Sequence, residues 1–532
     1  MAEQAKKKNM KTWIIVLVTV LIVGGGGATA FGLLLNNSPM AVYTEAQINT
    51  LEDQEERMED YNKNARSIAE RTLEEDYGVD GSLSMNVNAK GGEAAQSPNL
   101  MLVKSILSGI ELNYEQKTKY ETKEIYGGFD LQMQGQSLGS ANFYQDETNT
   151  SFQAPFLYDQ YLTFENDRFK ELIERTGESA EGMETFPNFV DSMQASLEPE
   201  EANEILKDYV ETIAEQLGED QFSMEDGVEF EGESYKKVTL DVSEEKSQEL
   251  ITAVLEQLKE DERVKEILET QANLNGLPSE EIQFATSVQE AIDNVDQIKL
   301  PEGIKMEAYI KDEIIEHQLL MMTIGDEESQ GEISMQFDYL PDGEERYEKA
   351  LTLDVTSQPD EASFQLNYSE TGNASGEDLK VDYTFGTTIE DSTMEQPVKL
   401  EGTANAVYRE NSVEAQFNVD LGELSGQAAV ASPQFSGTYK QETTEEDDTF
   451  KQDIELGIEA GIEDPTLGNQ NFEVTFNVNQ DVAFGGDLSF PDTEGAVNLA
   501  DATDEELQQL AQEIEMNFQS HVGQFMGGFG GF

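Results

Sequence analysis

Residues 413–421, Val413-Glu-Ala-Gln-Phe-Asn-Val-Asp-Leu421, alternate strictly between apolar and polar side chains. Successive side chains of a β-strand point to opposite faces, so this period of two predicts a strand with one buried and one wet face. The polar members are Glu, Gln, Asn and Asp, which places acidic and amide groups on the wet face. The recurrence of this pattern along the chain decides the fold class.

From residue 300 onward the alternation returns many times without an intervening helical pattern. It is present in segments 304–310, 320–324, 333–339, 364–368, 379–385, 413–421, 454–462 and 472–478. Parallel strands need crossover connections, usually helical, so this region predicts a long antiparallel meander. An earlier region shows the same alternation in segments 83–87, 110–114, 129–133 and 152–158.

Amphipathic helical patterns lie between and after these strand regions. Apolar residues at helical spacing predict helices at 205–217, 243–258, 278–292 and 503–522, and a thinner stripe predicts a polar helix over 44–75. Ser243 is a predicted N-cap, and Thr503 with Glu506 forms a predicted capping box. The class is therefore α+β and β-dominated: large antiparallel curved sheet or sheets with amphipathic helices packed on one face.

The N-terminus predicts a transmembrane helix over residues 13–35, an uncharged run that would rise about 34 Å and cross a hydrocarbon core of about 30 Å. The membrane-anchoring residues are Trp13, Ile14, Ile15, Leu17, Leu21, Phe31, Leu33, Leu34 and Leu35. The lysines that place the N-terminus in the cytoplasm are Lys6, Lys7, Lys8 and Lys11. The competing interpretation is a signal peptide cleaved near Ala30, after an A-x-A pattern. Phe31 and the three leucines beyond it continue the apolar run and favour the anchor.

These segments divide the chain into successive predicted parts. They are a cytoplasmic tail (1–12), the anchor (13–35), a connector and stalk helix (36–77), a first α+β domain (78–299), a β-meander domain (300–500), a C-terminal amphipathic helix (501–526) and a flexible tail (527–532). The location that follows is the cell membrane, single-pass, with the bulk of the chain outside. Whether the two β regions share one sheet stays open.

Charge and cysteine content exclude several classes of protein. The chain has 109 Asp and Glu against 33 Lys and Arg, a formal net charge of −76, and no cysteine. An acidic surface of this kind disfavours nucleic acid, and it fits either a saline or alkaline exterior or a surface that simply keeps the protein soluble. Without cysteine there is no disulfide framework, thiolate chemistry or lipid-modified cysteine.

Catalytic and metal motifs are weak. The two histidines, His317 and His521, lie in different segments, and both are interpreted as ordinary strand or helix residues rather than a general base. Acidic clusters at 342–345 and 445–448 lack a recognised calcium spacing, which favours solvated charge runs. We therefore expect no enzyme activity and no cofactor or metal site.

The layout resembles uncharacterised single-pass proteins anchored in the membrane of Gram-positive bacteria. The likeness lies in the lysine-rich start, Ser38-Pro39, the helix opening Tyr43-Thr-Glu-Ala46, and the strand Tyr235-Lys-Lys-Val-Thr-Leu-Asp-Val-Ser243 followed by the helix of Leu250–Leu258. The layout is also similar to lipoprotein-carrier half-barrels of the LolA and LppX type, whose resemblance implies binding of a lipid or other apolar molecule.

Three functions are predicted, in descending order. The first is a non-enzymatic, membrane-anchored binding or envelope-support protein holding a lipid or apolar ligand between sheet and helices. Phe129, Met133 and Phe156 are the residues expected to line that cavity. The second is a structural or adhesive surface protein acting through sheet edges or bound cations. The third is a hydrolase in which His317 meets a hydroxyl or a carboxylate. No protein partner follows from the sequence.

Overall fold

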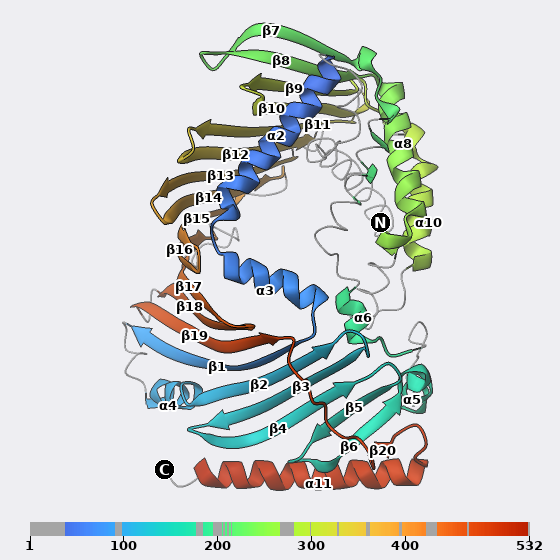
Figure 1. Cartoon of the computed structure of the whole chain (residues 1–532), viewed down its shortest axis with the longest axis vertical. Helices are drawn as coiled ribbons and strands as arrows, with labels where there is room; N and C mark the ends of the chain where they lie inside the picture. Colours follow the sequence, from blue (N-terminus) through green and yellow to red (C-terminus); the bar gives the residue numbers. More distant parts are fainter. Residues whose placement is uncertain are drawn as a thin grey trace.

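The computed structural model describes residues 38–90, 98–176, 185–194, 205, 208–209, 212–213, 215–265, 281–297, 299–326, 329–357, 362–392, 396–421, 434–464 and 468–529. Its dominant element is one continuous sheet of twenty strands that bends into an open curve (Figure 1). The spatial order is β7-β8-β9-β10-β11-β12-β13-β14-β15-β16-β17-β18-β19-β1-β2-β3-β4-β5-β6-β20. All neighbours are antiparallel except β6 and β20.

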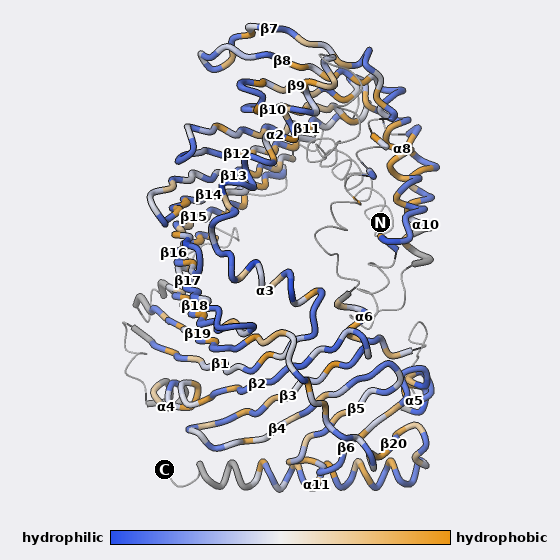
Figure 2. The backbone as a smooth tube through the Cα atoms, viewed as in Figure 1, coloured by the Kyte–Doolittle hydropathy of each residue, from blue (hydrophilic) through white to orange (hydrophobic). Residues whose placement is uncertain are grey.

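The strands follow the predicted alternation. Their bounds are β1 Tyr77–Lys90, β2 Ile110–Lys119, β3 Glu124–Met133, β4 Gln136–Gln145, β5 Asn149–Ala154, β6 Tyr158–Glu165, β7 Phe222–Phe230, β8 Glu233–Val242, β9 Ile304–Lys311, β10 Ile314–Asp326, β11 Ser329–Asp342, β12 Arg346–Ser357, β13 Ala362–Ser375, β14 Asp378–Glu390, β15 Val398–Arg409, β16 Ser412–Asp420, β17 Gln434–Glu446, β18 Thr449–Asp464, β19 Gly468–Phe484 and β20 Val497–Asn498. Figure 2 shows apolar and polar residues alternating along them.

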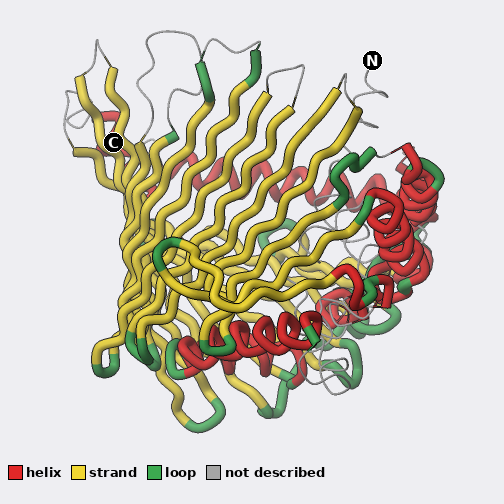
Figure 3. The backbone as a smooth tube through the Cα atoms, turned by 90° about the horizontal axis from the view of Figure 1, so that it is seen from above, coloured by secondary structure: helices red, strands yellow, loops and turns green. Residues whose placement is uncertain are grey.

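The helices form a smaller part of the described chain than the strands. Their bounds are α2 Pro39–Glu59, α3 Lys63–Glu74, α4 Pro98–Leu107, α5 Phe169–Thr176, α6 Phe189–Gln194, α8 Glu244–Glu260, α10 Glu281–Ile292 and α11 Asp504–Phe529, with single 3-10 turns at Asn166–Arg168, Glu219–Gln221 and Val295–Gln297. From above, the strands lie side by side, with helices gathered toward their margins (Figure 3).

Local capping explains where the helices begin. The Ser38 hydroxyl accepts the Ala41 N–H at 3.2 Å and Pro39 occupies the first turn of α2. Ser243 caps α8 through the Lys246 N–H at 3.4 Å. At α11, the Glu506 carboxylate accepts the Thr503 N–H at 2.8 Å and the Thr503 hydroxyl accepts the Glu506 N–H at 3.3 Å. The predicted cap and capping box are confirmed.

The predicted single helix over 44–75 is wrong, because it is broken into α2 and α3. Asn62, between them, has φ 56°, a left-handed conformation that asparagine tolerates better than most residues. The break turns the chain, so that α3 lies inside the curve of the sheet (Figure 1). We call the face on which α2 and α3 pack the inner face.

Three clusters of buried side chains hold helices to the inner face. The largest joins α2, α8 and α10 to strands β8–β11, with Leu250, Val254 and Met306 fully buried. A second gathers Tyr339, Tyr347 and Leu379 beneath the end of α2, and a third packs Ile68 of α3 near Phe450 and Phe484. These clusters cover only parts of the inner face.

The predicted α+β class is wrong: the chain is predominantly β, since one twenty-stranded sheet dominates it and the helices do not cover one face. The first strand, β1, pairs with β19 on one side and with β2 on the other. Strands from both predicted β regions thus share one sheet, which answers the question that the sequence left open.

Candidate binding face

The middle of the inner face carries a row of apolar side chains that lie outside the three buried clusters under the helices. The cross-strand register places them side by side across β13–β19 and β1–β3. We call this row the apolar band, and its members are Phe364, Leu366, Phe385, Ile389, Leu400, Phe417, Val419, Phe435, Leu456, Ile458, Val474, Phe476, Leu83, Met85, Leu112, Phe129 and Leu131. Each of these residues is half-buried or exposed.

Two aromatic rings of the apolar band occupy the space over glycines of the next strand. A Cβ added at Gly402 would stand 2.0 Å from the Phe385 ring, and one at Gly437 would stand 2.2 Å from the Phe417 ring. Any side chain at these glycines would therefore displace a ring. The absence of a side chain at Gly402 and Gly437 therefore gives the Phe385 and Phe417 rings room over the neighbouring strand.

Several members of the apolar band are much more exposed than core residues. Phe129 is 49% exposed, Ile389 40% and Leu131 39%, whereas Leu240 and Met306 under the helices are at most 2% exposed. Monomeric proteins rarely expose contiguous apolar patches of this kind unless the patch binds something. The band is the strongest candidate site in the described chain.

An open apolar pocket lies at the β2–β4 end of the band. We call this pocket the wedge, because it is a space that lies between the sheet and the second half of α11. It has a volume of about 370 Å3. Its lining residues are Leu112, Phe129, Leu131, Leu138, Gly139, Ser140, Ala141, Phe156, His521 and Val522.

Polar contacts hold α11 against the end of the sheet. The Asn517 amide donates to the Leu157 carbonyl at 2.8 Å, and Nε2 of His521 bonds to the Leu138 carbonyl. The His521 ring also lies 5.0 Å from the Phe156 ring, centroid to centroid. On α11 itself, Phe518 and Val522 remain exposed. The helix α11 is thus held in place as one wall of the wedge, and part of its own apolar side stays exposed.

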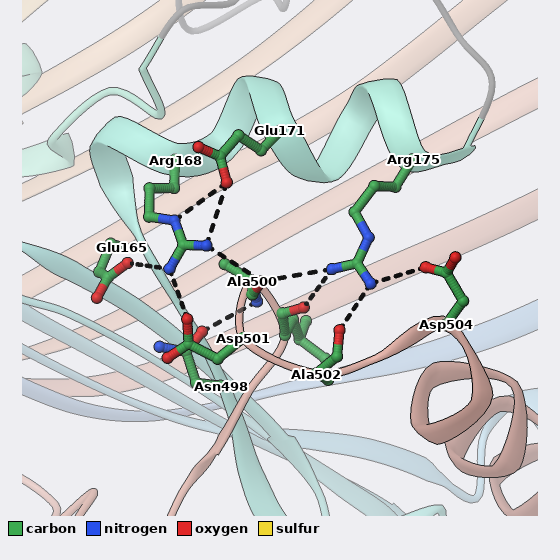
Figure 4. A network of polar contacts seen from close by, with 10 residues as sticks. Glu165, Arg168, Glu171, Arg175, Asn498, Ala500, Asp501, Ala502 and Asp504 are labelled. Atoms are coloured by element: carbon green, nitrogen blue, oxygen red, sulfur yellow. Dashed lines mark hydrogen bonds and ion pairs between the residues drawn. The ribbon is translucent and has the colours of Figure 1, made fainter.

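Two arginines secure the segment that leads into α11 (Figure 4). Arg168 donates to the Asp501 carboxylate at 2.7 Å and to the Ala500 carbonyl at 3.1 Å. Arg175 donates to the Ala502 carbonyl at 2.6 Å and to the Asp504 carboxylate at 2.9 Å. We call this arrangement the arginine clamp.

The outer face is acidic rather than apolar. A second pocket, of about 430 Å3, opens there between β15 and β19, with Glu401, Asp420 and Glu459 among its lining residues. No lysine or arginine lines it within the described part of the chain. No group of three or more His, Asp or Glu among the described residues is arranged to hold a metal ion.

His317 occupies a buried network on the outer face and does not line an open cleft. Its Nδ1 lies 2.7 Å from an Asp338 carboxylate oxygen, and its Nε2 lies 3.3 Å from the Tyr235 hydroxyl. That hydroxyl donates to Glu316 at 2.8 Å, and the Phe230 ring packs edge-on against the imidazole. A β-bulge between Ile315 and His317 turns Glu316 toward the same side. The histidine does meet a hydroxyl and a carboxylate, but it is only 2% exposed.

The structure places the other predicted site residues as follows. Phe129 and Phe156 line the wedge, whereas Met133 is not among its lining residues. The predicted anchor residues from Trp13 to Leu35 and the four lysines before them lie outside the described residues. Sequence reasoning missed the arginine clamp and the open state of the band. The sequence contains few helical patterns beside many strand patterns, and this imbalance could have indicated that part of the apolar face stays uncovered.

No protein-family model matches this chain, and no curated protein is similar to it in sequence. Among solved structures, it is similar to Pseudomonas aeruginosa OpdQ at 7% identity, with 77% of this chain and 97% of that chain covered and a TM-score of 0.24. P. aeruginosa OpdL (6%, 78% and 100%, 0.25) and Acinetobacter baumannii OccAB3 (6%, 76% and 99%, 0.23) are similar to the same degree. Likenesses this weak give the chain neither a family nor a function.

The predicted function is corrected. The helices α8 and α10 close a packed core on the sheet, with Leu250, Ile251 and Leu255 at most 1% exposed, so the space between these two helices and the sheet is filled. Phe129 and Phe156, two of the three residues expected to line an enclosed cavity, instead line an open pocket beside α11. An adhesive protein acting through bound cations would need a cluster of metal ligands, and the described residues form none. A hydrolase would need His317 to be accessible to a substrate, and His317 is buried.

The predicted membrane attachment and single-pass location are corrected as well. Across the part of the chain that the structure describes, no helix has the length and apolar character needed to cross a membrane. The expectation of a lipid or other apolar ligand is dropped too, because buried side chains fill the space between α8, α10 and the sheet.

Proposed function

We propose that this chain is a non-catalytic binding protein whose apolar band holds a positively charged, amphipathic segment of a partner polypeptide. The observation that supports this proposal is the exposed apolar row on a face where the described helices leave it open. The network of titratable side chains around His317 is buried and belongs to strand packing, which supports a binding role over an enzymatic one.

The dimensions of the band suit an extended helical segment. It crosses ten strands, β13–β19 and β1–β3, and adjacent strands lie about 4.8 Å apart, so it measures roughly 43 Å along the curve. A helix rising about 1.5 Å per residue would span that distance in somewhat under thirty residues. Apolar side chains every third or fourth position would meet the band, as in other grooves that receive amphipathic helices.

The charge of the chain decides between partners. At −76, a second copy of this protein would be repelled, and so would nucleic acid. A segment with lysine or arginine on its polar side is attracted to the acidic surface while its apolar side is buried on the band. Electrostatic attraction of this kind raises association rates and weakens with salt.

The test uses helical peptides of about two dozen residues with leucine on one face. The other face carries lysine, glutamine or glutamate in three otherwise identical peptides. We expect the full-length protein to bind the lysine peptide at least about tenfold more tightly than the glutamine peptide, and the glutamate peptide least. Binding is measured by fluorescence anisotropy at low salt, and the preference for lysine should shrink at about 1 M salt.

A matched pair of variants ties binding to the band. Phe385→Ser with Ile389→Ser removes two exposed band residues, and we expect about tenfold weaker binding of the lysine peptide. Met321→Ser is the control, since Met321 is equally exposed, at 39%, but points from β10 to the outer face. Equal effects of the two changes, or equal affinity for all three peptides, would contradict the proposed function.

A further inference from the structure

The wedge is continuous with the apolar band. Leu112, Phe129 and Leu131 belong to both, so a segment lying on the band reaches the wedge at its β2–β4 end. There the binding surface changes from a flat row of side chains to a walled pocket. A position with walls on two sides contributes more binding energy per side chain than a flat one, because it removes more apolar surface from water.

The wedge offers little to a charged or strongly polar group. None of its lining residues is Asp, Glu, Lys or Arg, and the imidazole of His521 is already bonded to the Leu138 carbonyl. Its apolar lining residues include Leu112, Phe129, Leu131, Phe156 and Val522. Its volume of about 370 Å3 is near the lower end of ordinary binding pockets, which suits one bulky side chain rather than a segment of backbone.

We infer that the wedge is the anchor subsite of the band, where one aromatic side chain of the bound segment inserts between α11 and the sheet. This inference rests on the proposed function and adds a rule of selectivity to it. The band accepts many amphipathic segments, and the wedge selects those with an aromatic residue at one end. Held by Asn517, His521 and the arginine clamp, α11 provides a wall that is already in place before binding.

The test compares two lysine-faced peptides that differ at one terminal position, tryptophan or alanine. With the full-length protein we expect the tryptophan peptide to bind about tenfold more tightly, and its fluorescence emission to shift to shorter wavelength on binding. Leu138→Ser with Val522→Ser changes two lining residues of the wedge that do not belong to the apolar band. It should abolish that difference while leaving the affinity for the alanine peptide nearly unchanged.

Met516→Ser is the matched control, because Met516 is 64% exposed on the same helix and does not line the wedge. It should keep the preference for tryptophan, and thermal unfolding should show all variants folded. If the two peptides bind the unaltered protein equally, or if the wedge variant keeps the preference, the anchor assignment is wrong while the band remains. If neither peptide binds, the proposed function fails and the anchor subsite with it.

Discussion

Asp53 shows how single side chains join a helix to the sheet. Its carboxylate accepts from Arg57 at 2.8 Å and from the hydroxyl of the buried Tyr339. Arg57 also donates to the Gly343 carbonyl at 2.9 Å, in the turn between β11 and β12. In a chain with so few cations, this arginine fastens α2 at a point where its own apolar stripe is thin.

The same contacts give the protein an acid-sensitive element. Burial acts to raise the pKa of Asp53, but the hydrogen bonds from Arg57 and Tyr339 and the nearby positive charges outweigh it and hold the pKa below its ordinary value. A carboxyl with a lowered folded-state pKa stabilises the fold above its unfolded pKa of about 3.9, and that contribution disappears as pH falls through the folded-state pKa.

We therefore expect Asp53→Asn to lower the free energy of unfolding at pH 7 by about 1 kcal/mol, allowing for partial solvent exposure of the carboxylate. The difference from the unaltered protein should shrink as pH falls below about 4. Urea unfolding at a series of pH values measures it, with Glu55→Gln on the exposed side of α2 as control. A difference that stays constant with pH would show that the Asp53 charge does not contribute.

Among the elements, α11 is attached to the sheet largely through polar contacts. No described residue of this helix is buried, so its attachment relies on the arginine clamp at its start and on Asn517 and His521 further along. Exposed ion pairs contribute little to global stability, but they can decide whether a local segment opens.

Changing both clamp residues, Arg168→Gln with Arg175→Gln, should release the segment before α11 without unfolding the sheet. We expect cleavage by a glutamate-specific protease near Glu505 to speed up severalfold, with the melting temperature changing by no more than about 2 °C. Lys123→Gln, which removes a surface pair with Asp191 elsewhere, is the control. An equal cleavage rate in both variants would rule out the clamp as the attachment.

Sequence reasoning succeeded for local elements and failed for the relations between them. Alternation located strands such as β16 and β19, and capping residues located the starts of α8 and α11, because these signals depend on near neighbours. The pairing of β1 with β19 joins residues about 400 positions apart, which no local pattern encodes. Alternation also cannot distinguish an apolar face that is covered from one that is open, so the band was interpreted as core.

At the scale of the whole molecule, the main electrostatic feature is a large excess of negative over positive charge. Even if each of the 33 cations paired with one carboxylate, 76 of the 109 carboxylates would remain without a cationic partner. Repulsion among them opposes the curved sheet, whose strands bring acidic outer-face residues close together. Salt screens this repulsion, with a Debye length of about 30 Å at 0.01 M and about 3 Å at 1 M.

Screening also weakens attractive pairs such as Lys237–Glu307, but these are far fewer than the repulsive ones. We therefore expect the melting temperature to rise by several degrees between about 0.02 M and 1 M sodium chloride, most steeply at the low end where the Debye length changes most. Differential scanning calorimetry measures this, with sucrose as a non-ionic control for general stabilisation. A melting temperature that fell with added salt would mean that attractive pairs dominate, and that the charge excess is spread too widely to strain the fold.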